Sequence, residues 1–428
     1  MRRIVWIAGR RNGPKELATD RRPPASLNAT PLASQEDKTS LTGMKICLVG
    51  LGNLPVLAPE YRHPIGGASV QQTLLARALA RRGHEVSMVV GDYGQADGAQ
   101  WDSIRVFKAY RPDAGLPVLR FVHPRWTGMW SALARADADI YYTNCAGMQV
   151  GLMALFCRRF RKRFVFRAAS DPDCDRSRVR VLIRFARDRW LYAYGLRRAN
   201  AILVQSASQA ETLARSYGLA SRVAGSFVEQ SPPVAARDID VLWVANIRRL
   251  KRPDRVLELA SSLPEAQIHI AGGPMPDEEA LFHEVSRAAA GRTNVRFHGA
   301  LSYHDANALY GRARVFVNTS EFEGFPNTYL QAWIRGVPVV TLIDPDGLIQ
   351  REGLGVAVSS PAQMCDAIRR LLGDLAAWKA ASDRCCAFMA RERGEDRVLG
   401  PYLETFEDVM RRDVTNARVI GAREARHA

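Results

Sequence analysis

The residues best suited to chemistry lie in one segment, Asn318 to Val340, which reads NTSEFEGFPNTYLQAWIRGVPVV. Its pattern predicts a strand, a loop, a helix, a turn and a second strand. Gly324 allows the backbone to approach a ligand closely, and Pro326-Asn327 opens a helix whose free N–H groups and dipole can hold a diphosphate. We therefore expect the Glu323 carboxylate to face the same ligand.

This segment resembles the hallmark of the family 4 glycosyltransferases. The hallmark is Ser-x-x-Glu-Gly-Phe-Pro, a second acid eight positions after the first, then Ala and Gly-x-Pro-Val-Val. The resemblance implies that Glu323 contacts the hydroxyls of the donor sugar. It also implies that the backbone after Gly324 meets the donor phosphates. The donor-binding residues so implied are Gly324, Phe325, Pro326 and Asn327.

One position departs from the family pattern. The second acid, which in the family grips the ribose of the donor, is Gln331 in this chain. A glutamine carbonyl oxygen can still accept a hydrogen bond from a ribose hydroxyl. We expect Gln331 to bind the donor without the charge.

A second match to the family lies between Trp243 and Asp254. The family has Gly-Arg-Leu and a Lys four residues after the Leu, and Lys251 has that spacing. Asn246 takes the position of the family's Arg and is a predicted donor-binding residue, so we expect Arg248 to supply the second cation. Cations at this place neutralise the leaving diphosphate as the glycosidic bond breaks. The predicted catalytic residues are thus Glu323, Lys251 and Arg248. The alternative for Lys251 and Arg248 is that they are solvated cations at the start of a helix, without a catalytic role.

In the first half of the chain, His63-Pro64-Ile65-Gly66-Gly67 precedes a clear helical pattern that ends at Gly83. Family 4 members share this signature, and the resemblance places the backbone of Gly66 and Gly67 beside the donor phosphates. Asp171 has two readings, a contact to the acceptor or sugar, or a turn cap before Pro172.

The elements that must position these residues alternate between short β-rich runs and helical patterns, as in βαβ units around parallel sheets. The expected strands are Lys45–Val49, Glu85–Val90, Ile104–Phe107, Asp139–Tyr142, Arg163–Arg167 and Ala201–Val204, then Asp240–Val244, Gln267–Ala271, Asn294–His298, Val315–Asn318, Val337–Thr341 and Gly355–Val358. A proline-rich break near Pro232-Pro233 separates the two series.

The predicted fold class is therefore α/β, and the resemblance implies the GT-B type. Two Rossmann-like, doubly wound parallel-sheet domains would face a cleft that holds the active site. We expect a disordered extension over residues 1–43, an acceptor-side domain over 44–230, a nucleotide-sugar domain over 238–385, helices that return towards the first domain over 386–412, and a tail over 413–428.

Composition supports a globular protein with anionic partners. The chain has 428 residues, 47% hydrophobic and 24% charged, with a formal net charge of +16. From Arg158 to Arg198 it carries fourteen Lys and Arg against four Asp and Glu. Such a field favours nucleic acid or an acidic membrane surface, and a solvated basic face without a partner is the alternative. Interleaved aromatic residues favour the membrane, so we expect no nucleic acid partner.

The expected location is the cytoplasm, with peripheral attachment at the inner face of the cytoplasmic membrane. No stretch reaches the eighteen or so apolar residues that a membrane span needs. The seven cysteines are odd in number and form no C-x-x-C pair, and Cys47 lies in an apolar run, which suits a reducing compartment.

The resemblance implies a retaining, front-face transfer of a sugar from a nucleotide-sugar to a glycan or lipid-linked acceptor. We expect no cofactor and no metal, because no Asp-x-Asp lies near the predicted phosphate site. Two alternatives stay open. A catalytically inactive scaffold is favoured by Gln331 and Asn246. A dinucleotide-binding oxidoreductase would need Gly-x-Gly-x-x-Gly, and Gly50-Leu51-Gly52 lacks the third Gly.

Overall fold

The computed structural model describes residues 43–61, 63–111, 113–116, 119–229, 236–275 and 278–424, with side chains described as far as Arg411. All of them belong to one compact unit, Leu41–Ala428. The predicted disordered extension lies outside the described residues except for Gly43.

The first half of the chain forms an eight-stranded sheet with the order β3-β4-β2-β1-β5-β6-β7-β8. All its neighbouring strands are parallel except the β3–β4 pair. The strands are β1 (Lys45–Val49), β2 (Glu85–Val90), β3 (Gln100–Trp101), β4 (Ile104–Lys108), β5 (Ile140–Asn144), β6 (Arg163–Arg167), β7 (Ala201–Val204) and β8 (Arg222–Val223). The six predicted strands of this half are all present, to within two residues at each end.

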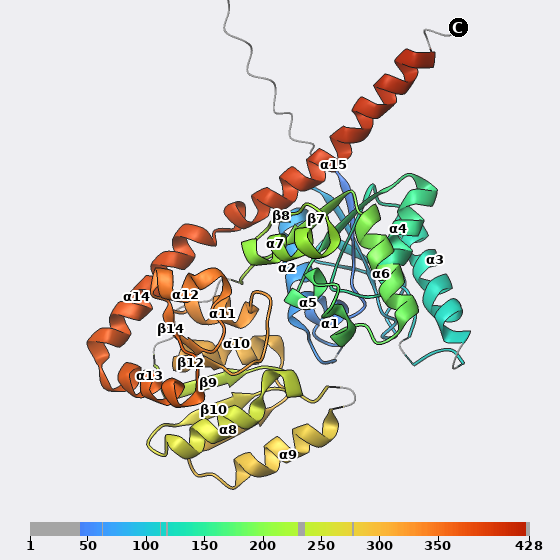
Figure 1. Cartoon of the computed structure of the whole chain (residues 1–428). Coiled ribbons are helices and arrows are strands. Elements are labelled where there is room, and N and C mark those ends of the chain that lie inside the picture. Colours follow the sequence, from blue (N-terminus) through green and yellow to red (C-terminus); the bar gives the residue numbers. More distant parts are fainter. Residues whose placement is uncertain are drawn as a thin grey trace, which may run out of the picture. The chain divides into compact units, whose positions relative to one another are not determined.

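The helices of this half are α1 (Leu54–Leu57), α2 (Gly67–Arg81), α3 (Thr127–Ala136), α4 (Met148–Phe160), α5 (Asp171–Cys174), α6 (Ala186–Arg198) and α7 (Ala207–Tyr217). Shorter turns are η1 (Leu119–Phe121), η2 (Val122–Trp126) and η3 (Val179–Val181). Figure 1 shows α3, α4 and α6 side by side along the first sheet.

Both faces of the first sheet are covered, because successive side chains of a strand point to opposite faces. Ile46 and Leu48 of β1 lie in one hydrophobic cluster with α1 and α2, whereas Cys47 and Val49 lie in another with α3, α4, α6 and α7. This arrangement explains why the strand is a continuous apolar run rather than an alternating one.

The second half forms a six-stranded, fully parallel sheet with the order β11-β10-β9-β12-β13-β14. Its strands are β9 (Ile239–Val244), β10 (Ile268–Ala271), β11 (Val295–Gly299), β12 (Ala313–Asn318), β13 (Val339–Thr341) and β14 (Gly355–Ala357). Its helices are α8 (Pro253–Ser262), α9 (Glu279–Ala290), α10 (Tyr303–Arg312), α11 (Asn327–Trp333), α12 (Leu348–Glu352), α13 (Pro361–Gly373) and α14 (Leu375–Glu392), with short turns η4 (Arg249–Lys251) and η5 (Pro345–Gly347). Two parallel-sheet Rossmann-like domains are thus present, which confirms the predicted fold class; the exact domain limits stay a prediction.

The last helix, α15 (Glu395–Glu424), connects the end of the second half to the core of the first. Leu399, Tyr402 and Phe406 are buried in the same cluster as α2. The Tyr402 hydroxyl also donates to the carbonyl oxygen of Gly225 at 2.8 Å. The preceding helix, α14, packs on the second sheet instead, through Phe388.

Candidate active site

The predicted site begins with two loops that follow neighbouring parallel strands. β9 and β12 are adjacent in the second sheet, so the loops after their carboxyl ends meet at one edge. Thr319 joins these loops, because its hydroxyl donates to the carbonyl oxygen of Lys251 at 2.8 Å and accepts from the indole N–H of Trp243 at 2.9 Å. The N–H of Glu321 also donates to the carbonyl oxygen of Leu250 at 3.0 Å.

Lys251 and Glu323 form an ion pair between Nζ and Oε1 at this edge. Their side chains are 22% and 15% exposed, so a ligand at the edge can reach both groups. The Ser320 hydroxyl donates to the same carboxylate oxygen at 2.7 Å. The structure therefore brings together the two residues that the sequence places 72 positions apart.

Arg248 lies near the same loop but contacts a different acid. Its Nε is 3.6 Å from Glu278 Oε1, and the neighbouring N–H of Arg249 donates to Glu278 Oε2 at 2.6 Å. Sequence reasoning did not identify Glu278. Glu278 is thus the acid partner of Arg248, whereas Lys251 pairs with Glu323.

The glycine loop of the first half meets the second half directly. The Asn246 side-chain amide donates to the carbonyl oxygen of Ile65 at 3.0 Å, and the Asn327 amide donates to that of Gly67 at 2.9 Å. A Cβ at Gly67 would lie 2.8 Å from Asn327 Nδ2, so a larger residue would displace the Asn327 amide from its present position. Four predicted donor-binding residues, Gly66, Gly67, Asn246 and Asn327, are thus close together.

Gly324 and Phe325 contact a residue that sequence reasoning missed. A Cβ at Gly324 would lie 2.3 Å from Oε1 of Gln205, and the N–H of Phe325 donates to the same oxygen at 3.0 Å. Gln205 follows β7 of the first sheet. The glycine thus allows Gln205 to approach the loop; the approach of a ligand to Gly324 stays a prediction. Pro326 precedes α11, which begins at Asn327 as expected.

Gln331 is buried, at 5% exposure, and its amide is fully engaged within the second half. Its Nε2 donates to the Tyr303 hydroxyl at 2.8 Å, and its Oε1 accepts from Arg335 Nη1 at 3.0 Å. Burial lowers the pKa of Arg335 and raises that of Tyr303. The four-residue spacing from Gln331 to Arg335 is the signal that could have revealed this contact.

Asp171 lies close to the predicted site. Burial raises the pKa of its carboxyl; the hydrogen bond from Gln209, at 3.0 Å, opposes this rise, and the negative charges of Glu323 and Asp346 add to it. The capping role belongs to Asp173 instead, whose carboxylate accepts from the N–H and hydroxyl of Ser170 at 3.1 and 3.0 Å. The turn-cap reading of Asp171 is therefore wrong.

Asp346 is a further contact between the halves that the sequence did not reveal. Its carboxylate accepts from the N–H groups of Ala207 and Ser208, at 3.0 and 3.3 Å, at the start of α7. A carboxylate is favourable there because a helix N-terminus carries partial positive charge. Among the described residues, no group of three or more His, Cys, Asp or Glu side chains is placed to hold a metal ion.

Two family models match the chain. Residues 65–224 match the model described as Glycosyltransferase Family 4, and residues 238–374 match the one described as Glycosyl transferases group 1. These matched ranges contain all of the predicted site residues.

Among curated proteins, the chain is similar to the D-inositol 3-phosphate glycosyltransferase of Mycobacterium avium (strain 104). The two are 29% identical over 192 residues, which is 42% of this chain and 45% of that protein. The match therefore spans less than half of that relative's length.

Among solved structures, sucrose-phosphate synthase from Thermosynechococcus elongatus superposes with a TM-score of 0.63 at 18% identity, over 89% of this chain and 99% of that one. A TarM variant from S. aureus, crystallised with fondaparinux, alpha-GlcNAc-glycerol and UDP, superposes with a TM-score of 0.55 at 14% identity, over 66% of this chain and 59% of that one. At these identities the superpositions establish a shared fold.

Proposed function

Because the chain belongs to the family 4 glycosyltransferases of group 1, we propose that it transfers a sugar from a nucleoside diphosphate sugar to a glycan or lipid-linked acceptor, with retention of anomeric configuration. The observation that carries the proposal is the Lys251–Glu323 ion pair, which lies at the carboxyl edge of the second sheet. The TarM complex with UDP supports a nucleotide donor.

Lys251 and Glu323 have complementary roles in this proposal. Lys251 Nζ contacts the diphosphate, where a point charge neutralises the charge that develops as the sugar leaves. In the part of the chain that the structure describes, Glu323 Oε2 accepts no hydrogen bond, whereas Oε1 is engaged by Lys251 and Ser320. Oε2 is therefore the oxygen that accepts from a hydroxyl of the donor sugar.

The transfer needs no protein base. The acceptor hydroxyl attacks the anomeric carbon from the face on which the diphosphate leaves, and the bond from that carbon to the phosphate oxygen breaks. The departing oxygen keeps the electron pair and takes the acceptor proton, which yields the glycosylated acceptor and a free nucleoside diphosphate. We propose that protein cations supply the positive charge, without a metal: Lys251 directly, and Arg248 once it exchanges Glu278 for the phosphate.

The first test is donor recognition. We expect one class of nucleotide-sugar among uridine, guanosine and adenosine diphosphate sugars to raise the melting temperature of the full-length protein. The same donor should then release free nucleoside diphosphate when an acceptor fraction from a cell extract is added. If none of these donors raises the melting temperature or is consumed, the transfer proposal is wrong.

A catalytically inactive scaffold is the second candidate, and one observation favours it. Both ends of the Gln331 amide are occupied by Tyr303 and Arg335, so a ribose must compete with them for the glutamine. A scaffold would bind the donor without acceptor-dependent release of nucleoside diphosphate. Membership of the family leaves the oxidoreductase alternative without support.

We also propose that the protein works in the cytoplasm, attached to the inner face of the membrane. No helix within the described ranges is both long and apolar enough to cross a bilayer. Support for attachment comes from the basic segment between Arg158 and Arg198, in which Phe185 and Trp190 are exposed. Basic and aromatic side chains together suit a headgroup surface.

A further inference from the structure

An arginine-rich pocket lies on the first half of the chain, outside the contacts described so far. Its volume is about 750 Å³. The residues that line it are Arg176, Arg180, Val181, Leu182, Arg184 and Arg189. Four of the six are arginines and none is an acid. We call this set the arginine pocket.

The arginines of this pocket are positioned by backbone oxygens rather than by carboxylates. Arg180 Nε donates to the carbonyl oxygen of Ser177 at 2.8 Å, and Arg189 Nη1 donates to that of Arg184 at 2.6 Å. The acids that flank them are engaged elsewhere: Asp188 pairs with Arg187, and Asp175 accepts from Ser177. Over the described ranges, none of the four pocket arginines has an ion-pair partner.

Unpaired guanidinium groups that share a pocket repel one another, so an anion between them is favourable. Arginine presents a planar fork of N–H donors that matches a phosphate in two-point contacts. The absence of any acid from the lining rules out a cationic ligand. A phosphate or diphosphate group is the ligand that this lining fits.

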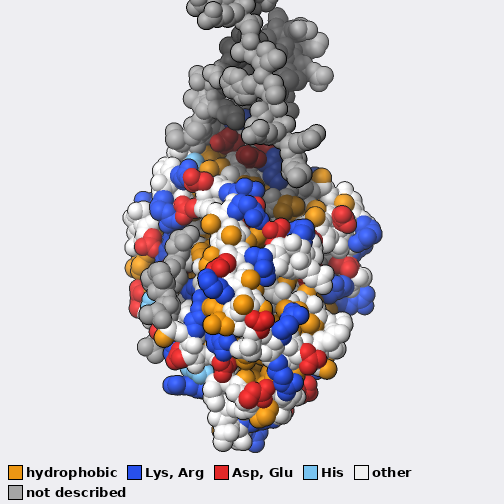
Figure 2. Space-filling model, turned by 90° about the vertical axis from the view of Figure 1, so that its left-hand side faces the viewer, with side chains coloured by type: hydrophobic (Ala, Val, Ile, Leu, Met, Phe, Trp, Pro, Cys, Tyr) orange, Lys and Arg blue, Asp and Glu red, His pale blue; other side chains and the backbone are white. Residues whose placement is uncertain are grey.

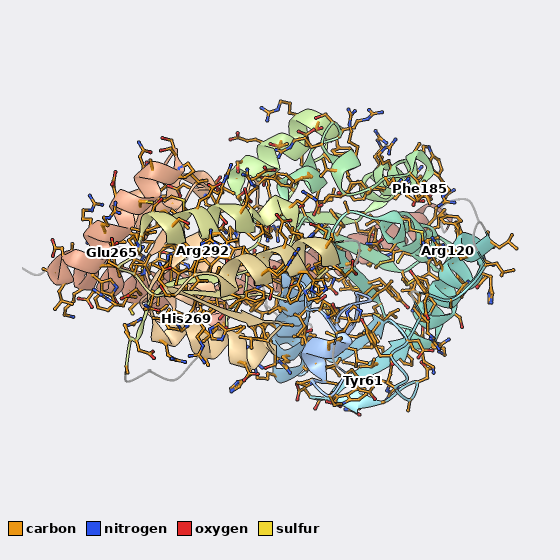
Figure 3. All side chains as sticks on the ribbon, turned by 90° about the horizontal axis from the view of Figure 1, so that it is seen from below. Tyr61, Arg120, Phe185, Glu265, His269 and Arg292 are labelled. Carbon is orange, nitrogen blue, oxygen red and sulfur yellow. The ribbon has the colours of Figure 1, made fainter. Side chains whose placement is uncertain are left out.

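Exposed apolar side chains surround the arginine pocket. Val181, Leu182 and Phe185 are 62%, 40% and 58% exposed, and Trp190 is 65% exposed. Leu119 and Val122 are also exposed. The segment that carries them contacts the segment that carries the pocket, since the Arg187 guanidinium lies 3.4 Å from the centre of the Phe121 ring. Figure 3 shows the labelled Arg120 and Phe185 near one another at one end of the molecule.

The second half of the chain lacks such a surface. The described side chains of the second half span residues 236–275 and 278–411. Among them, Leu375 is the one large hydrophobic side chain that is exposed. Figure 2 shows the face that carries α13 and α14, where basic and acidic side chains are interspersed. The pocket region thus combines arginines with four exposed large apolar side chains, whereas the described part of the second half has one such side chain.

The segment that forms the arginine pocket also contacts the loop of the predicted active site. The Arg178 guanidinium lies 5.4 Å from the centre of the Phe322 ring, and Phe322 directly precedes Glu323. Arg178 does not line the pocket, but Arg176 and Arg180, which do, lie two residues on either side of it. One segment of the chain therefore carries both the pocket and a contact to the Glu323 loop.

We infer that the arginine pocket binds the phosphate or diphosphate of a lipid-borne acceptor, whose chain stays in the membrane beneath Phe185 and Trp190. This inference rests on the proposed function, because it names the acceptor class of the same site. The phosphate fixes the acceptor at the pocket, and the apolar rim enters the headgroup layer. The glycosyl-accepting end of the molecule then points to the Glu323 loop.

The test is vesicle binding by the full-length protein, measured by co-sedimentation. The vesicles contain phosphatidylcholine with phosphatidic acid, which presents a terminal phosphate, or with phosphatidylserine at matched surface charge. Wild type should prefer phosphatidic acid, and inorganic pyrophosphate should compete for this binding. The double variant Arg180→Ala/Arg184→Ala should lose at least about tenfold in affinity for phosphatidic acid vesicles, since each lost arginine removes a charge-assisted contact.

The matched control is Arg105→Ala/Arg296→Ala, which removes two exposed arginines outside the pocket. It should keep the preference for phosphatidic acid. A second variant, Phe185→Ala/Trp190→Ala, should lose vesicle binding yet keep binding of inorganic pyrophosphate. Equal binding of wild type to the two anionic vesicles, or an unchanged preference in Arg180→Ala/Arg184→Ala, overturns the inference.

Nucleoside diphosphate binding separates this inference from the proposed function. Melting-temperature shifts with uridine, guanosine and adenosine diphosphates are measured on the same variants. Pocket variants should retain the wild-type shift, because the donor site lies on the second sheet. If the melting temperature of the wild type does not shift with any nucleoside diphosphate but the protein still prefers phosphatidic acid vesicles, the transfer proposal is refuted and the phosphate pocket is supported. If the melting temperature shifts but the preference for phosphatidic acid is absent, the phosphate pocket is refuted.

Discussion

The charge of Lys251 should determine how tightly the protein binds a nucleoside diphosphate. Lys251→Met keeps the length of the side chain and removes its charge. A hydrogen bond to a charged group contributes about 1.5–3 kcal/mol, which corresponds to roughly 10- to 150-fold in affinity. In the free protein Lys251 is paired with Glu323. The cost of breaking this pair offsets part of the binding free energy that the contact of Lys251 with the phosphate contributes. We therefore expect the lower end of the range, a loss of about tenfold.

Isothermal titration of nucleoside diphosphate into the wild type and the variant measures this loss. Lys251→Arg should retain part of the affinity, because the positive charge remains. The control is Lys379→Met, which removes a lysine from the exposed face of α14, where it pairs with Asp383. The control should bind as wild type does. Unchanged affinity in Lys251→Met would refute the assignment of Lys251 to the phosphates.

Three further predictions follow from contacts around the site. Gln331→Glu should leave turnover within about tenfold, or roughly 1.4 kcal/mol in the barrier, because a carboxylate can also accept from Arg335; a larger loss in steady-state assays would contradict this. Asp346→Asn should lower the free energy of unfolding in urea by up to about 1 kcal/mol at low salt and by less at high salt, because the charge at the start of α7 is lost. Asparagine tolerates the φ of 51° at this position, so the backbone should not add to the loss. A loss that does not depend on salt would contradict the charge effect. Burial, with smaller effects from His298 and Arg296, lowers the pKa of His269 from 6.5 to about 4. Below pH 6.5 His269 becomes protonated in the unfolded chain but stays neutral in the folded protein. The free energy of unfolding therefore falls as the pH drops towards 4. His269→Gln should flatten this fall in thermal melts, and an unchanged pH profile would exclude His269 as its source.

The fold was predictable because its signals are local. Runs such as 46–49 and Ala201–Val204 are apolar throughout, as is typical of strands covered on both faces. The helix at Gly67 has its apolar residues on one face and a glycine after its end. The shortest strands, β3 and β8, have two residues each and carry too little pattern to predict.

The candidate site was predictable where residues lie on loops after adjacent strands. Lys251 and Glu323 meet because β9 and β12 are neighbours, a consequence of doubly wound topology. Contacts between the two halves were not predictable, because Gln205 and Asp346 have partners more than a hundred residues away. No local pattern encodes such pairs; they depend on how the two sheets pack in this chain.

Arg248 illustrates a different limit. Arg248 was predicted as a phosphate cation because Asn246 takes the position of the family's Arg, and the sequence around it gives no sign of an acid partner from another loop. Glu278 supplies that acid and also accepts from the N–H of Arg249.

Sugar transfer by wild type and Glu323→Ala, assayed side by side, tests the central claim most directly. The assay follows acceptor-dependent release of nucleoside diphosphate, with the donor identified by melting-temperature shift and an acceptor fraction from a cell extract. Glu323→Ala should keep a melting temperature close to that of wild type, because its carboxylate is at the edge of the sheet, and should lose most of its turnover. Equal rates of transfer in the two proteins would contradict the account.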